Sequence, residues 1–215
     1  LLYFCKYHPP GNFIIDRTSN ALKDSYDKQS DSRIKREILK ALGNSDRGED
    51  ADFIKVKIQS EKNDYIVAEG ITALGKSLRK DQIYEVVFPF AFRTAHRNVV
   101  QNAVINALDN ADNETGDQRI KKYLLDIAFG TDVDGWLRLN ALNALRTYAK
   151  DEDVKALAKK YADYNFIFVK RAMINLLASS EDKSLIQFFK EMNEKTTDEE
   201  FSKFLLAAIK KLESF

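Results

Sequence analysis

Trp136 and Arg138 form the arrangement in this chain that is most able to bind a ligand. Trp136 is the only tryptophan, and Arg138 stands two positions later in the stretch DGWLRLNALNALRTY. A tryptophan face and a guanidinium together can stack a ligand or a nucleobase. Trp136 also stands one residue before an apolar core position, Leu137, which favours a structural role. We therefore keep both residues only as candidates for a partner surface.

The other residues able to do chemistry are few and scattered. His96 and Arg97 could bind an anion, although a polar pair before an apolar helix is typical of a connection. Cys5 would need a base within hydrogen-bond reach to act as a nucleophile, and His8, before two prolines, better fits an exposed linker. The sequence contains no Gly-rich phosphate loop, Cys cluster or paired-carboxylate motif. It therefore predicts no catalytic residue, metal ligand or cofactor site in this chain.

The composition is that of a folded helical protein. Of the 215 residues, 44% are apolar and 31% are charged, while three are proline and eight are glycine. So few punctuating residues favour helices over a turn-rich β protein. The 34 basic residues are balanced by 33 acidic ones, so the excess expected of a nucleic-acid binder is missing. We expect neither a nucleic acid nor a membrane as partner, since no apolar run approaches about 20 residues.

Compartment and completeness can also be predicted. The single cysteine and the lack of a secretion signal lead us to expect a cytoplasmic protein. The chain begins LLYFCKYHPP without an initiator methionine. We interpret it as part of a longer protein.

A ladder of apolar residues recurs six times. Each copy ends in a leucine, with further apolar residues three and eight positions earlier, and this spacing places them on one stripe of an α-helix. The anchor leucines are Leu42, Leu74, Leu108, Leu145, Leu177 and Leu212. Their separations, by subtraction, are 32, 34, 37, 32 and 35 residues. Such a period is typical of helical-repeat proteins.

A second helical segment lies between each pair of ladders. These segments are 53–60, 82–92, 119–129, 154–162 and 184–192. One helix pair cannot bury both apolar faces, so stacked neighbours must complete the core. We predict an all-α fold, an α-α superhelix of about six stacked helix pairs.

The predicted domains are an N-terminal capping segment over 1–30 and one continuous helical-repeat domain over 31–215. Residues 14–22 fit either a second helix of an earlier pair or the first helix of the pair that ends at Leu42. The sequence leaves both alternatives open.

Turn-forming residues mark the connections between the predicted helices. Short polar side chains that favour helix N-caps are Asp31, Asn63, Asp134, Asp163 and Asn165. Gly43 and Gly75 follow their anchors, where a left-handed C-cap is common. Pro89 interrupts the run FPFAF (88–92) and predicts a bend, which serves either packing or the presentation of Phe90 and Phe92 to a partner.

Three of the ladder helices open with an apolar residue followed by a basic one. The pairs are Ile34-Lys35, Leu137-Arg138 and Val169-Lys170. Together with the repeat length, this pattern resembles the HEAT repeat over about residues 31–213. The resemblance implies a solenoid whose second helices face a partner. The candidate partner surface is then Lys35, Gln101, Trp136, Arg138 and Lys170.

A narrower resemblance concerns the C-terminal HEAT-like domain of gluzincin zinc aminopeptidases of the alanyl/leucyl type. Four stretches look similar to its successive units: 63–77, 96–108, 127–145 and 165–186. In that family HExxH and a downstream glutamate bind zinc. The motif is absent here, because His96 is followed by Arg-Asn-Val-Val. The resemblance therefore implies that zinc and the chemistry belong to a domain upstream of Leu1.

The expected function is a non-catalytic domain that shapes access to that upstream active site. Its partner would be the catalytic domain of the same polypeptide. The alternative is a stand-alone HEAT-repeat scaffold that binds another protein. A third class, catalytic or DNA-binding solenoids, is disfavoured by the balanced charge.

Overall fold

The computed structural model describes residues 12–45, 47–111 and 117–215 of the chain. Within these ranges every regular element is helical and no β-strand occurs, so the all-α prediction is confirmed. None of these helices combines the length and the apolar composition that crossing a bilayer requires. The chain divides into two compact units, Leu1–Asp112 and Asn113–Phe215.

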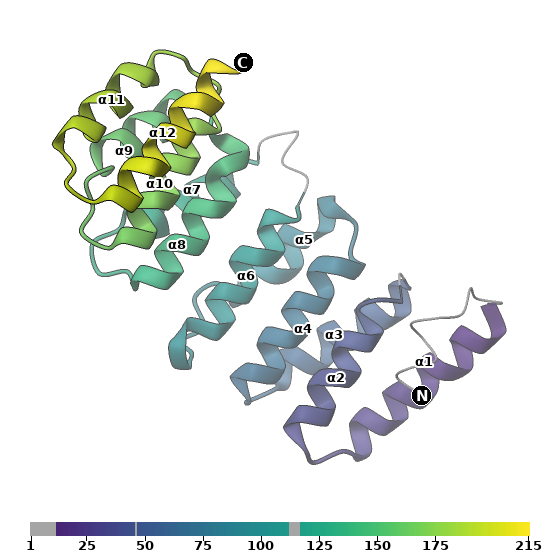
Figure 1. Ribbon diagram of the computed structural model, residues 1–215. Helices are drawn as coiled ribbons and strands as arrows, with labels where there is room; N and C mark the ends of the chain where they lie inside the picture. Colours follow the sequence, from purple (N-terminus) through teal and green to yellow (C-terminus); the bar gives the residue numbers. More distant parts are fainter. Residues whose placement is uncertain (1–11, 46, 112–116) are drawn as a thin grey trace. The chain divides into compact units, whose positions relative to one another are not determined.

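The first unit contains six α-helices in its described part. They are α1 (Asn12–Lys28), α2 (Ser32–Leu42), α3 (Gly48–Ser60), α4 (Asp64–Ser77), α5 (Lys80–Val87) and α6 (Val99–Asp109). Helix α4 packs between α2 and α6, and α1, α3 and α5 pack on α2, α4 and α6, respectively (Figure 1). The unit is thus three helix pairs whose second helices lie side by side. Residues 14–22 belong to α1, the first helix of the pair that ends at Leu42.

The second unit repeats this arrangement. Its helices are α7 (Gln118–Phe129), α8 (Gly135–Ala144), α9 (Glu152–Lys160), α10 (Ile167–Ala178), α11 (Leu185–Lys195) and α12 (Glu199–Glu213). Helix α10 packs between α8 and α12, while α7, α9 and α11 pack on α8, α10 and α12. A helix is therefore confirmed in each of the five segments expected between the ladders, namely α3, α5, α7, α9 and α11, although α5 ends at Val87 and covers only the first part of the segment 82–92.

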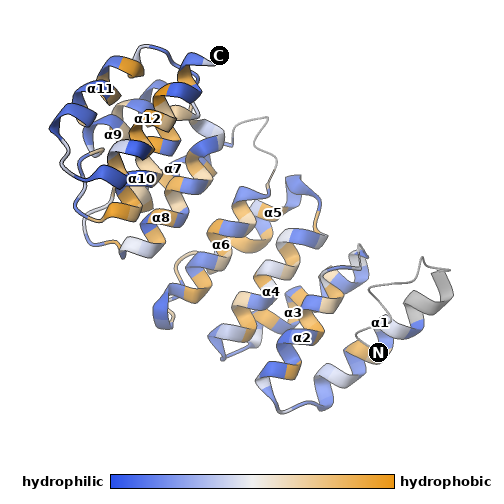
Figure 2. Cartoon of the chain, viewed as in Figure 1, coloured by the Kyte–Doolittle hydropathy of each residue, from blue (hydrophilic) through white to orange (hydrophobic). Residues whose placement is uncertain are grey.

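The apolar ladders form the core of each unit. All six anchor leucines are at most 1% exposed. Apolar residues concentrate where the helices of a unit face one another (Figure 2). Burying one leucine side chain contributes roughly 1.5–3 kcal/mol, so the repeated anchors are a main source of stability in both units.

Gly43 and Gly75 do not adopt the left-handed conformation that we expected. Gly43 has a right-handed φ of −66° and Gly75 lies inside α4. A Cβ on Gly43 would lie 2.5 Å from Cβ of Ala73, and one on Gly75 would lie 2.8 Å from Cβ of Ala107. The expectation was wrong because these glycines allow close contact between neighbouring second helices rather than a left-handed turn.

The N-cap predictions are confirmed in three of five places. The side chains of Asp31, Asn63 and Asp134 accept hydrogen bonds from backbone N–H groups at the starts of α2, α4 and α8. Asp163 and Asn165 do not cap α10, because its N-cap residue is Phe166. Two further caps that the sequence reading missed are Asp117 on α7 and Asp198 on α12.

Pro89 ends a helix, as its missing N–H predicts. Helix α5 stops at Val87, and Phe88–Phe90 continue as a 3₁₀ helix, η2. Two other short 3₁₀ helices are η3 (His96–Asn98), before α6, and η4 (Leu145–Tyr148), after α8.

Candidate protein-binding site

Three aromatic rings gather at the N-terminal ends of α8 and α10 in the second unit. The ring centroid of Trp136 lies 5.6 Å from that of Phe166 and 5.4 Å from that of Phe168, and the two phenylalanine rings are 5.5 Å apart. Trp136 is 55% exposed and Phe168 is 47% exposed. We call Trp136, Phe166 and Phe168 the aromatic patch. Edge-to-face and tilted rings at these distances attract one another, so the patch is a preformed surface.

The backbone around the patch explains why the rings meet. Asp134 accepts hydrogen bonds from the N–H groups of Trp136 and Leu137, which fixes the first turn of α8. Gly135 follows this cap, and a Cβ there would lie 3.0 Å from the Phe166 ring. Glycine therefore lets Phe166 pack against the start of α8, while Trp136 and Phe168 remain about half exposed.

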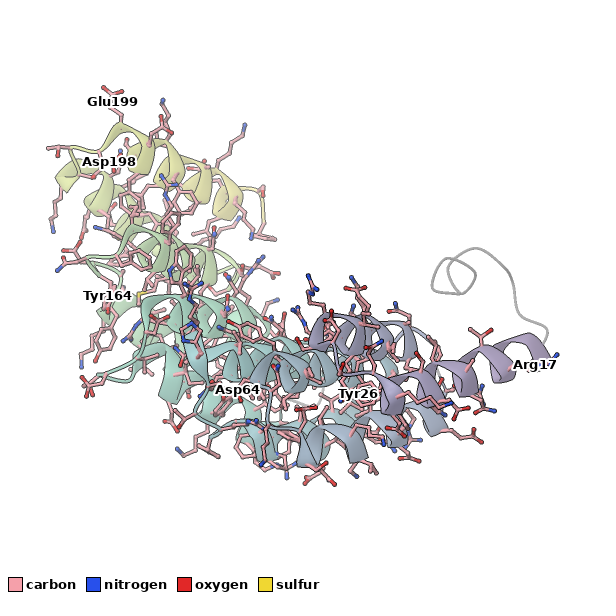
Figure 3. All side chains as sticks on the ribbon, turned by 90° about the horizontal axis from the view of Figure 1, so that it is seen from below. Arg17, Tyr26, Asp64, Tyr164, Asp198 and Glu199 are labelled. Carbon is pink, nitrogen blue, oxygen red and sulfur yellow. The ribbon has the colours of Figure 1, made fainter. Side chains whose placement is uncertain are left out.

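Arg138 is not exposed to a partner. It is only 3% exposed, and its guanidinium donates to the carbonyl oxygens of Ala128 at 2.7 Å and Gly130 at 2.8 Å. The guanidinium also lies 5.0 Å from the ring centroid of Tyr164. Tyr164, which Figure 3 labels, lies in the loop before α10. The basic residue that we expected on the surface instead joins the end of α7 and the loop before α8 to the loop before α10.

The other three candidates are half-buried. The Nζ of Lys35 lies 4.9 Å from the ring centroid of Tyr26 in α1. The Nζ of Lys170 lies 2.6 Å from Asp163 and 4.8 Å from the ring centroid of Phe201 in α12. Gln101 buries its Oε1 atom without a hydrogen-bond partner among the described residues. Trp136 and Lys170 belong to the packed helices α8 and α10 of the second unit, whereas Lys35 and Gln101 belong to the first unit.

A buried polar cluster surrounds Asp50 in the first unit. This carboxylate is fully buried, accepts hydrogen bonds from the hydroxyls of Ser19 and Ser45, and lies 2.6 Å from Nζ of Lys23. Burial raises the pKa of Asp50, but the hydrogen bonds from Lys23, Ser19 and Ser45 outweigh it and hold the pKa below its ordinary value. Because each polar group has a partner within the fold, we interpret the cluster as a link between α1 and α3.

Similar ion pairs join the first helices of the second unit. The Nζ of Lys121 in α7 lies 2.6 Å from Asp151 and 2.9 Å from Asp153, next to and within α9. Burial lowers the pKa of Lys121, but its hydrogen bonds to the two carboxylates raise it above the ordinary value. Lys155 in α9 reaches Asp182, before α11, at 3.1 Å. These charges stabilise contacts between successive helix pairs.

A groove with a volume of about 540 Å³ is lined by residues of α7 and α9. Its charged residues include Lys121, Lys122, Asp126 and Asp153. They neutralise one another, since Lys122 lies 2.7 Å from Asp126 and Lys121 lies 2.9 Å from Asp153. The groove therefore presents no net charge to a ligand.

The remaining chemistry-bearing residues do not assemble a site in the described parts of the chain. His96 and Arg97 are exposed in η3, where Arg97 and Asn98 have φ values of 51° and 53°. Cys5 and His8 lie outside the described residues. Over the ranges that the structure describes, no three His, Cys, Asp or Glu side chains group as a metal ion would require.

Comparisons with known proteins identify no family. No protein-family model matches the sequence, and no curated protein matches it significantly. Among solved structures, the chain is similar to an engineered protein from the Northeast Structural Genomics Consortium, at 16% identity and a TM-score of 0.53. The match covers 90% of this chain and 97% of that chain. At this identity the likeness concerns the fold alone.

Proposed function

We propose that this chain is a non-catalytic helical-repeat domain that acts by binding protein. The observation that carries the proposal is the aromatic patch, where Trp136 and Phe168 are about half exposed although their rings already contact each other. Tryptophan and other aromatic residues are enriched at the energetic centres of protein interfaces, and a contiguous exposed apolar patch is typical of an interaction surface. A protein partner would remove this apolar surface from water.

The most buried charged groups are paired with other groups of the fold, which supports the non-catalytic part of the proposal. Among the described charged residues, Asp50, Lys121 and Arg138 are the most buried. Each forms hydrogen bonds or ion pairs with neighbouring helices or loops. Such groups stabilise the fold, and none of them faces the aromatic patch as a free acid, base or nucleophile.

We also propose that the six helix pairs, from α1 to α12, continue as one HEAT-like α-α superhelix. Two features support this arrangement. Second helices contact one another in chain order within each unit. The anchor spacing of 37 residues from Leu108 to Leu145 is close to the spacings inside the units. Small-angle X-ray scattering of the whole chain tests it, because a superhelix gives one fixed elongated profile and two loosely tethered units give a broader distribution of distances.

The narrower form of the proposal places the partner in the same polypeptide. It rests on the sequence resemblance to the C-terminal domain of gluzincin zinc aminopeptidases, and it puts zinc and catalysis in an upstream domain of a cytoplasmic enzyme. The gene decides between this form and a stand-alone scaffold. A reading frame that runs into Leu1 and encodes HExxH supports the aminopeptidase form, and an upstream frame without that motif refutes it. The purified chain alone should neither bind zinc nor cleave aminoacyl amides.

The protein-binding proposal itself is tested with Trp136→Ala. The upstream domain, or a stoichiometric partner isolated with the chain, should bind the variant at least about 10-fold more weakly, as expected for an interface hot spot. The thermal unfolding of the variant should change little, because Trp136 is half exposed. Tyr65→Ala, at a ring of similar exposure in the first unit, serves as the matched control. Unchanged affinity of Trp136→Ala for such a partner would refute the proposed role of the patch.

A further inference from the structure

Two rings of the aromatic patch, Trp136 and Phe168, share a repeat position with a ring in the first unit. Tyr65, Trp136 and Phe168 each stand nine residues before their anchor leucine, by subtraction from Leu74, Leu145 and Leu177. All three are between 43% and 55% exposed. The same place at the start of a second helix therefore carries an exposed aromatic ring in both units.

In the first unit a cation from the chain itself covers this ring. The guanidinium carbon of Arg36 in α2 lies 5.9 Å from the ring centroid of Tyr65 at the start of α4. Glu69, one turn after Tyr65, lies 3.6 Å from the same guanidinium. A ring face and a carboxylate together hold one arginine, an arrangement that cation–π attraction and ion pairing both favour.

In the second unit the corresponding cation is missing. Arg36 stands six residues before Leu42, on the second helix that precedes the helix of Tyr65. The matching residue for Phe168 is six before Leu145, which is Leu139, and the one for Trp136 is six before Leu108, which is Asn102 of the first unit. No lysine or arginine in the described part of the chain lies over the ring of Trp136 or Phe168, although such contacts occur at eight other aromatic residues of the two units. The ring faces that the fold covers with arginine in one unit are left open in the other.

The exposed charges next to the open rings are negative. Asp132 and Asp134 lie in the loop that leads into Trp136, and both are exposed. Asp163, before Phe166, is already paired with Lys170. Arg138 is buried on loop carbonyl oxygens. A cationic group on a partner would therefore meet both ring faces and the exposed carboxylates of Asp132 and Asp134.

We propose that the aromatic patch binds an arginine side chain of a partner protein. Its guanidinium stacks on Trp136 and Phe168, as Arg36 does on Tyr65, and the loop of Asp132 and Asp134 supplies the negative charge. Arginine suits the site better than lysine because its planar guanidinium stacks on an aromatic face while donating hydrogen bonds at its edge. This inference rests on the proposed protein-binding function and names the chemistry that the patch recognises.

The test titrates the whole chain with two synthetic peptides, capped at both ends. One is Gly-Leu-Arg-Leu-Arg-Leu-Gly, and the other has citrulline, a neutral group of nearly the same shape, in place of each arginine. Trp136 is the only tryptophan, so its fluorescence reports binding at the patch directly. We expect a saturable change with the arginine peptide and about 5-fold or more weaker binding of the citrulline peptide, which corresponds to about 1 kcal/mol of cation–π attraction.

Isothermal titration calorimetry of two variants with the arginine peptide shows where on the chain the peptide binds. Phe168→Leu keeps an apolar side chain but removes one ring face, and should weaken the arginine peptide about 5-fold. Tyr65→Leu makes the same kind of change at the equivalent place in the first unit and should leave the affinity unchanged. Circular dichroism of each variant checks that the helices are intact.

Three results would overturn the inference. Equal affinity for the two peptides, or none for either, would show that no arginine is recognised. Tighter binding of single-stranded DNA would identify a stacking surface for bases. Self-association of the chain that Trp136→Ala abolishes would identify a second copy as the occupant. None of these results decides the proposed function, because that test uses the upstream domain or an isolated partner instead of peptides.

Discussion

The Nζ atom of Lys23 in α1 lies 2.6 Å from Oδ1 of Asp50 in α3, and Lys155 and Asp182 are separated by the same 27 positions in the second unit. Both pairs connect the first helix of one pair to the beginning of the next first helix. The two sites differ in burial: the Asp50 side chain is 0% exposed, and that of Asp182 is 30% exposed. The same contact should therefore contribute very different amounts to stability.

Asp50→Asn should lower the free energy of unfolding by about 3 kcal/mol, because Lys23 then keeps a largely buried charge without its partner. Urea denaturation at neutral pH, followed by circular dichroism, measures the loss. Asp182→Asn is the matched control and should cost less than about 1 kcal/mol, since Asp182 is partly exposed and Lys155 keeps Glu152 as a second partner. Equal losses for the two variants would contradict the assigned difference in burial.

The same carboxylate should make the first unit sensitive to acid. Hydrogen bonds from Lys23, Ser19 and Ser45 overcome the effect of burial and lower the pKa of Asp50 below its ordinary value. A group with a lowered folded-state pKa stabilises the fold above its unfolded pKa, about 3.9, and this stabilisation is lost as the pH falls through the lower folded value. We expect unfolding free energies to decrease below about pH 4, less steeply in Asp50→Asn than in the unchanged chain. Superimposable pH profiles would argue against this role.

The sequence predicted the features that recur in every helix pair. It did not predict features that depend on a single tertiary contact. The anchor leucines could be found because every helix pair must bury the same stripe. Arg138 was expected on the surface, since a basic residue after Leu137 is ordinarily solvated. Its burial depends on the carbonyl oxygens of Ala128 and Gly130, whose positions no local pattern gives. Phe166 and Phe168 were overlooked as site residues, although the position nine before the anchor could have grouped Phe168 with Trp136.

Gly43→Ala should destabilise the first unit by about 1–3 kcal/mol, because the new methyl group would overlap Ala73 of the neighbouring second helix. Gly48 provides the control, since a Cβ there meets no atom within 4 Å. Gly48→Ala should be neutral or slightly stabilising, as alanine restricts the unfolded chain. Urea denaturation of the two variants gives the comparison, and a stabilised Gly43→Ala variant would rule out the proposed close contact.

Arg138→Met should destabilise the second unit by at least about 2 kcal/mol. The substitution keeps much of the side-chain volume but leaves two loop carbonyl oxygens without their donor. The fluorescence of Trp136 follows unfolding of this unit. Arg146→Met is the control, because Arg146 is exposed and makes only a 3.4 Å contact with Ser179, so its loss should stay within about 0.5 kcal/mol. If Arg138→Met were as stable as the control variant, the hydrogen bonds of Arg138 would not stabilise the second unit.

Asp134 and Asp163 both precede a second helix of the second unit, yet only Asp134 caps one. Asp134→Ala should cost about 1 kcal/mol, because the N–H groups of Trp136 and Leu137 lose their acceptor. Asp163→Ala removes only an ion pair to Lys170 whose carboxylate is 92% exposed, and should cost less than about 0.5 kcal/mol. Thermal unfolding monitored by circular dichroism compares the two. Because the cap also fixes the turn that carries Trp136, Asp134→Ala should weaken peptide binding at the patch as well, and a larger effect from Asp163→Ala would contradict this assignment.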